Sequence, residues 1–278
     1  MNLQQAQDTL AADAGQADLV FPTNAKIALR IQKLLEDPDC SIEQLSKLLS
    51  AEPFLLSRLL NIANSVAYNR SGRTMSDVRS AISLLGFNTL RPLVTAVLIR
   101  QMQGMSQAPA QRALAGRLWE HTAHVAALAR VIAQRVTQQD PDAAFFAGII
   151  HEVGGFYLIS QGTRFPELLD NGLAWWRETG EARIGRAVVG VLGVPENIRN
   201  AQESLWHGYL SMPPQSLGDT LLLADQLSPL ASPLSGIDEI AREAPPADLD
   251  LMIDDVMLSG ILAESAEEVN SLIEALKG

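Results

Sequence analysis

Cysteine is nearly absent from this sequence, and so are the features of exported and membrane-spanning chains. A single cysteine, Cys40, among 278 residues cannot form an internal disulfide and fits a reducing compartment. Residues 1–18 are polar and lack the basic segment and apolar core of a signal peptide. No uninterrupted apolar run approaches the roughly 20 residues that span a bilayer. These absences predict a cytoplasmic protein with no membrane partner.

Basic residues are also scarce relative to acidic ones. The chain has 21 lysines and arginines against 32 aspartates and glutamates, which gives a net charge of −11. Such a charge repels polyanions, and no basic run offsets it. The composition therefore predicts that nucleic acid is not a partner.

Regular β alternation is missing as well, whereas helical signals recur along the whole chain. Apolar residues repeat at spacings of three and four, as in Ile27, Ile31 and Leu34. Helix starts are marked by capping residues such as Ser41, and Gly86 is a typical residue for a helix end. Because 47% of the residues are hydrophobic, a large core is expected. The sequence predicts an all-α fold.

The segment Gln101 to Pro109, with a glycine, a serine and a proline, is the best candidate boundary between two helical lobes. With a short leader before the first lobe and a tail after the second, the chain is expected to have four parts. We expect a leader over residues 1–20, an N-terminal helical lobe over 21–104, a second helical lobe over 105–234, and an acidic helical C-terminal tail over 235–278.

An imidazole and a carboxylate lie side by side in an otherwise apolar stretch, residues 143–159. His151 and Glu152 are costly to bury unless they are hydrogen-bonded, paired or bound to a metal. Both are good ligands for divalent ions. The alternative is a satisfied core histidine beside a glutamate that turns toward water, and for an isolated pair we favour this alternative. Gly154 and Gly155 are expected to loosen the helix directly after the pair.

Two sequence blocks resemble the HDOD family, whose name means HD-related output domain. Glu52 to Ser65 (EPFLLSRLLNIANS) resembles its DPxLxxRLLxxANS segment, and Ala81 to Arg91 (AISLLGFNTLR) resembles its AIxxLGxxxLR segment. HDOD proteins are all-helical bacterial signalling modules related to HD-domain phosphohydrolases. The resemblance covers about residues 21–227 and implies an HD-like helical bundle with an N-terminal helical lobe.

The resemblance also implies a set of metal ligands. HD phosphohydrolases bind a metal through a helical histidine, a later His-Asp pair and a final aspartate. The matching residues here are His121, His151, Glu152 and Asp225. Glu152 stands where the family has aspartate, and its extra methylene displaces the oxygens by roughly a bond length, against a tolerance of about 0.2 Å for metal–ligand distances. The sequence demands no cofactor, and a divalent metal ion at a degenerate HD site is the one candidate.

Two further departures concern catalysis. The HD-GYP phosphodiesterase branch of the family has a lysine where this chain has Gly155, and a histidine where it has Trp206. The resemblance therefore implies the loss of a phosphate-binding cation and of a metal ligand, both of which phosphoryl hydrolysis uses. No Walker loop, dinucleotide-binding glycine motif, GxSxG elbow or CxxC is present.

Two hypotheses of different class follow. In the first, the protein is a non-catalytic signal-transduction module that contacts another protein or a second copy of itself. In the second, it is a divergent metal-dependent phosphohydrolase of a nucleotide or phosphoester, with a metal-bound water as nucleophile.

Overall fold

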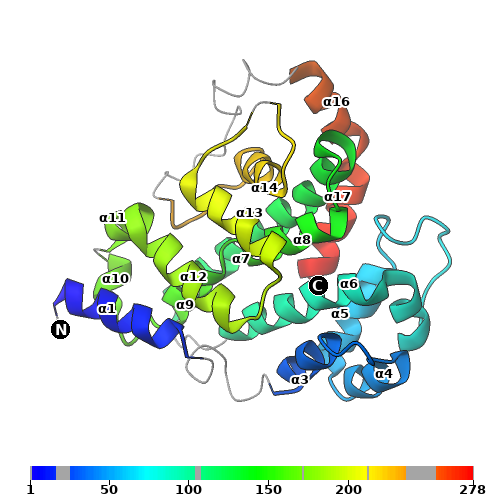
Figure 1. The fold of residues 1–278 in the computed structure, drawn as a ribbon, viewed down its shortest axis with the longest axis horizontal. Coiled ribbons are helices and arrows are strands. Elements are labelled where there is room, and N and C mark those ends of the chain that lie inside the picture. Colours follow the sequence, from blue (N-terminus) through cyan, green and yellow to red (C-terminus); the bar gives the residue numbers. More distant parts are fainter. Residues whose placement is uncertain are drawn as a thin grey trace.

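The computed structural model describes residues 2–16, 26–103, 108–170, 172–211, 213–235 and 255–277. Regular structure in these ranges is helical throughout, and none of the described residues forms a strand (Figure 1). The predicted all-α fold is confirmed.

The first helices along the chain are α1 (Leu3–Ala14), α3 (Lys26–Leu35), α4 (Ile42–Ser50), α5 (Pro53–Ala63) and α6 (Val78–Gln103). The middle of the chain forms α7 (Pro109–Ile132), which continues into a π-helical turn (Ala133–Thr137), then α8 (Pro141–Ile150), α9 (Val153–Ser160), α10 (Pro166–Asp170) and α11 (Leu173–Trp175). A second π-helical turn (Trp176–Gly180) leads into α12 (Glu181–Val191), followed by α13 (Glu196–His207), α14 (Leu217–Gln226), α16 (Asp255–Glu264) and α17 (Ala266–Lys277).

Helix α7 is the centre of the packing, because α8, α14 and α17 all lie against it. Helices α3, α4 and α5 gather around α6 at one end of the molecule (Figure 1). Helix α6 also packs on α8 and α9, so it connects this end to the rest of the bundle. The expected boundary between residues 104 and 105 lies outside the described residues, and the division into lobes stays a prediction.

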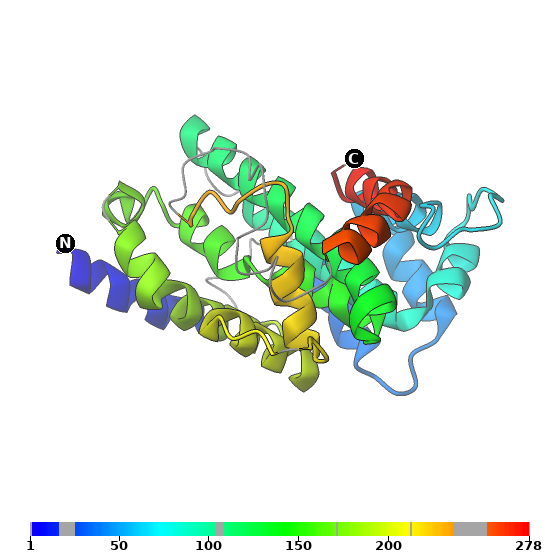
Figure 2. The same ribbon diagram turned by 90° about the horizontal axis from the view of Figure 1, so that it is seen from above.

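Both ends of the chain pack onto the bundle. Helix α1, within the expected leader, lies against α12 and α10, at the opposite end from α3 (Figures 1 and 2). Helix α17, within the expected tail, packs on α7 and α5. Its last turn is held there because Arg58 donates to the Ala275 carbonyl at 2.9 Å and Trp119 Nε1 to the Leu276 carbonyl at 3.3 Å.

One local expectation agrees with the backbone and one does not. Gly86 has a φ of 72°, which interrupts the helical geometry inside α6. The expected loosening at Gly154 and Gly155 is wrong, because both residues are helical within α9. The helix is interrupted at His151 and Glu152 instead. His151 Nδ1 forms a hydrogen bond with the Gly148 carbonyl. In a continuous helix this carbonyl would accept a hydrogen bond from the Glu152 N–H instead.

Two helical stretches are apolar and long enough to cross a membrane by length and composition, Val78–Met102 and Pro141–Ser160. Neither is an uninterrupted apolar run, since polar residues interrupt both. In their most apolar windows 67% and 89% of the residues are buried inside the protein. Both therefore serve as core helices in this fold, and the absence of a membrane partner stays a prediction.

Helices α7 and α8 cross at backbone contact through Gly148. A Cβ at this position would lie 2.4 Å from the Ala126 Cα and 2.9 Å from the Ala126 nitrogen, distances that real Cβ atoms do not adopt. Since backbone atoms cannot move aside as a side chain can, only glycine allows this approach. The crossing sets how far apart the two helices hold their histidines.

Replacing Gly148 with alanine is expected to lower the free energy of unfolding by about 1–3 kcal/mol, because the added methyl overpacks the α7–α8 contact. The matched control is Gly190→Ala, since a Cβ at the exposed Gly190 of α12 meets nothing within 4 Å. That change is expected to be neutral or to stabilise by up to about 1 kcal/mol. Urea unfolding followed by circular dichroism measures both. Equal stabilities of the two variants would contradict the close contact.

Candidate metal centre

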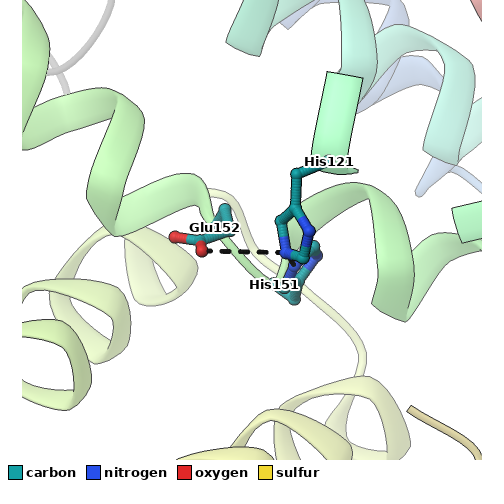
Figure 3. Close-up of side chains that lie close together, drawn as sticks. All are labelled: His121, His151 and Glu152. Carbon is teal, nitrogen blue, oxygen red and sulfur yellow. Dashed lines mark hydrogen bonds and ion pairs between the residues drawn. The ribbon is translucent and has the colours of Figure 1, made fainter. Parts of the chain in front are cut away.

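Two histidines from different helices meet in the core (Figure 3). His121 lies in the middle of α7 and His151 directly follows α8, and their exposed fractions are 0% and 3%. Their Nε2 atoms are 3.0 Å apart, and the two rings meet edge to face. The α7–α8 crossing thus brings together two imidazoles whose sequence positions are far apart.

Backbone carbonyls fix the tautomer of both rings. His121 Nδ1 lies 2.7 Å from the Leu230 carbonyl oxygen, and His151 Nδ1 lies 2.7 Å from that of Gly148. A carbonyl only accepts hydrogen bonds, so each Nδ1 carries a proton, and Nε2 has a free lone pair whenever the ring is neutral. Histidines that ligate metals are oriented in the same way, through a hydrogen bond from the other ring nitrogen.

Two carboxylates approach the same nitrogen. Glu152 Oε1 is 4.0 Å and Asp225 Oδ1 is 3.3 Å from His121 Nε2. The structure therefore brings all four sequence-predicted residues to one place. Ligand atoms of His121, His151 and Glu152 lie within 4.8 Å of one another, whereas Asp225 approaches through His121. Glu152 Oε2 is buried and has no hydrogen-bond partner among the described residues.

Asp225 is positioned by the way α14 begins. The carboxylate of Asp219, in the first turn, accepts hydrogen bonds from the backbone nitrogens of Ser211 at 2.9 Å and Ser216 at 2.8 Å. Burial raises the pKa of Asp219, but these and further hydrogen bonds outweigh burial and hold that pKa below its usual range. The charged carboxylate thus fixes the start of the helix that carries Asp225.

The pKa values of the two histidines are driven apart. Burial and, after it, the charge of His121 lower the pKa of His151 to about 4. Burial also lowers the pKa of His121, but the hydrogen bond and charge of Asp225 and the charge of Glu152 outweigh it, so that pKa is raised. These shifts favour a proton on His121 Nε2, which would then donate to His151 Nε2 at 3.0 Å. A divalent cation could replace it, since two nitrogens bound to one ion at ~2.0–2.1 Å lie roughly 2.9–3.4 Å apart.

Beside the histidines lies a cavity of about 220 Å³, into which His151, Glu152 and Asp225 face. Its other charged residues are Glu178, Glu181 and Arg177. Glu181 was not among the residues that the sequence singled out. Burial raises its pKa to about 8, helped by the charges of Glu152 and Asp225, so it lies close enough to sense both carboxylates. Its segment, Glu178 to Glu181, reads as an ordinary polar turn and gives no sequence signal.

Gly155 and Trp206, the two positions that differ from the HD-GYP pattern, are both packed. A Cβ at Gly155 would lie 2.7 Å from the Leu234 Cδ1 and 2.9 Å from Glu152 Oε2. Trp206 lines the cavity and packs so closely on Gly185 that a Cβ there would lie 2.4 Å from its ring. A longer side chain at Gly155 would therefore have to displace the ends of the Leu234 and Glu152 side chains.

The HDOD domain family matches residues 21–187, which is more than half of the chain. The chain belongs to the HDOD family. The family match ends at residue 187, whereas the resemblance was expected to reach about residue 227. Trp206 and Asp225 therefore lie outside the matched residues.

Solved structures show the same fold. One from Shewanella amazonensis SB2B, named "Putative metal-dependent phosphohydrolase", has a TM-score of 0.74 and 19% identity, covering 98% of this chain and 99% of that chain. An HDOD domain protein with unknown function from Geobacter sulfurreducens has a TM-score of 0.60 and 23% identity, covering 97% and 98%. At these identities the likeness shows the HD-like fold alone. No curated protein matches this sequence.

Metal binding at this centre is expected to depend on His151. Co²⁺ added to the purified protein should give visible absorption bands, and His151→Ala should weaken binding at least ~10-fold by removing a ligand nitrogen. His124→Ala is the matched control, because His124 lies on the same helix but bonds to the Glu120 carbonyl instead.

The affinity should also depend on pH. The cation must displace the proton on His121, whose pKa is raised, so binding should weaken as the pH falls and strengthen as His121 loses its proton. Titrations with Co²⁺ at several pH values measure this dependence. A pH-independent affinity, or bands that persist in His151→Ala, would show that the ion binds elsewhere.

Proposed function

We propose that this HDOD protein is a non-catalytic output module of bacterial signal transduction in the cytoplasm. It acts through contacts with another protein or with a second copy of itself, and its HD-type centre serves as a structural element of the core. The observation that carries this proposal is the charge of the cavity beside the centre. The lining of the cavity has one guanidinium, that of Arg177, against four acidic side chains, those of Glu152, Glu178, Glu181 and Asp225.

This balance of charge is unsuited to a phosphoester. With all four acidic side chains ionised, a divalent ion at the histidines and one guanidinium would leave a net negative charge around the substrate. With Glu181 protonated, below its raised pKa of about 8, they would leave no net positive charge. Phosphoryl transfer needs the opposite, because cations must stabilise the charge that develops on the phosphoryl oxygens. A phosphate monoester, itself an anion, would meet repulsion at the point where hydrolysis must attract it.

The one guanidinium is already engaged. Arg177 Nε donates to the Leu173 carbonyl at 3.2 Å, and its Nη1 lies 3.5 Å from the Ser235 carbonyl. A replacement cation on a side chain at Gly155 would have to displace the ends of the Leu234 and Glu152 side chains, which occupy the space beside it. These contacts support a centre that has kept its ligand residues without the groups that bind a phosphate.

The second candidate is a divergent metal-dependent phosphohydrolase acting on a nucleotide or phosphoester. It is favoured by the convergence of His121, His151, Glu152 and Asp225. The residues present fit a divalent ion, because both Nε2 lone pairs face the same point and Glu152 Oε2 lacks a partner. A bound ion would supply an activated water molecule. His121, His151 and Glu152 would hold it, with Asp225 beside His121.

Hydrolysis assays separate the two candidates. The purified protein, with Mn²⁺, Mg²⁺, Fe²⁺ or Ni²⁺ added, is expected to give no turnover of cyclic dinucleotides, nucleotides or a chromogenic phosphoester above that of His151→Ala. The reason is the missing phosphate-binding cation. Turnover in the native protein that disappears in His151→Ala would reject the non-catalytic proposal and support the phosphohydrolase.

A further inference from the structure

The side of the centre that faces the cavity carries one more carboxylate than the family resemblance supplies. Glu181 is the first residue of α12 and lines the cavity together with His151, Glu152 and Asp225. None of the described residues donates a hydrogen bond to Glu181 or forms an ion pair with it. It is thus a carboxylate that is mostly buried and has no partner of its own.

Glu152 supplies an independent sign of a missing ligand. The residue is 5% exposed, and one of its oxygens, Oε1, lies toward His121. Figure 3 shows that the other oxygen points away from both histidines. This atom, Oε2, is buried without a hydrogen-bond partner in the described part of the chain. Burial raises the pKa of Glu152, and a buried carboxyl oxygen of this kind costs free energy unless a cation or a donor satisfies it.

We propose that Glu181 is a further carboxylate of the cation centre, which binds the ion or one of its water ligands from the cavity side. The inference rests on the cation centre described above and adds a residue that neither the family pattern nor the spacing of motifs indicates. Burial raises the pKa of Glu181, and the charges of Glu152 and Asp225 raise it further. A cation between these three groups would relieve the repulsion among them.

Glu181 would also change which ion the centre prefers. His121 and His151 offer two nitrogens, and three carboxylates then surround them. Such a donor set suits six-coordinate ions such as Mn²⁺ better than Zn²⁺, which favours four ligands in a tetrahedron. The roomy cavity leaves space for the water molecules that complete a six-coordinate shell.

Titration of the full chain with Mn²⁺, followed by calorimetry or by the paramagnetic resonance of the free ion, tests the proposal. Glu181→Gln should weaken Mn²⁺ binding by roughly 10–100-fold, the range found for residues that support a metal site. Glu178→Gln is the matched control, because Glu178 lines the same cavity and belongs to the same turn. It should leave the affinity within about twofold of the native value, a difference of less than ~0.5 kcal/mol.

Thermal melting separates a role in cation binding from a role in folding. Without added ion, Glu181→Gln should melt at the same temperature as the native protein or higher, because the amide avoids the free-energy cost of burying a carboxyl group whose pKa is raised in the folded state. With Mn²⁺ its melting temperature should rise less than that of the native protein. A variant that melts lower without the ion and gains as much from Mn²⁺ would overturn the proposal in favour of a structural role.

Each remaining result also decides the matter. Equal Mn²⁺ affinities of native protein and Glu181→Gln would overturn the role of Glu181 and leave the proposed function untouched. If the native protein does not bind Mn²⁺, both the role of Glu181 and the cation centre itself are overturned. Phosphoester turnover by a native protein whose Mn²⁺ affinity depends on Glu181 would instead reject the non-catalytic function and keep this inference.

Discussion

The approach of two imidazole nitrogens to 3.0 Å is the interaction on which the rest of the centre depends. Both Nδ1 atoms are committed to backbone carbonyls, so both Nε2 lone pairs point into the same small space. Two such lone pairs repel unless a proton or a cation lies between them. The glycine that lets α7 and α8 touch, the interrupted helix at His151 and the carbonyl of Leu230 all hold this geometry. The proton or cation between the two histidines carries a positive charge, and the nearby carboxylates of Glu152 and Asp225 stabilise that charge.

Local features of the fold could be predicted from the sequence because they depend on neighbours in the chain. Apolar spacing predicts the helices, and Gly86 breaks α6 as a glycine with positive φ does. Asn64, at the end of α5, forms two side-chain hydrogen bonds to the backbone of Met75, at 2.7 and 2.8 Å, as asparagines at helix ends often do. The four candidate ligands came from the family resemblance, since no rule of spacing places Asp225 beside His121.

Features set by long-range packing could not be predicted in this way. The tail helix α17 was expected only as an acidic helix, yet Arg58 and Trp119 bind its last carbonyls. Glu181 belongs to a polar turn in the sequence, and only the packing of α12 brings it to the cavity. The helix break falls at His151 rather than at the glycines, because a side chain competes for a backbone carbonyl. Each of these depends on a contact that neither propensity nor motif encodes.

Anomalous X-ray scattering from crystals soaked in Mn²⁺ tests most directly the claim that the two histidines and Glu152 form a cation-binding centre. The account predicts an anomalous peak within bonding distance of His121 Nε2, His151 Nε2 and a Glu152 oxygen, with the two Nδ1 hydrogen bonds to carbonyls unchanged. No peak at the histidines, with the two Nε2 atoms still in direct hydrogen-bond contact, would contradict it. The pair would then be held by a proton alone.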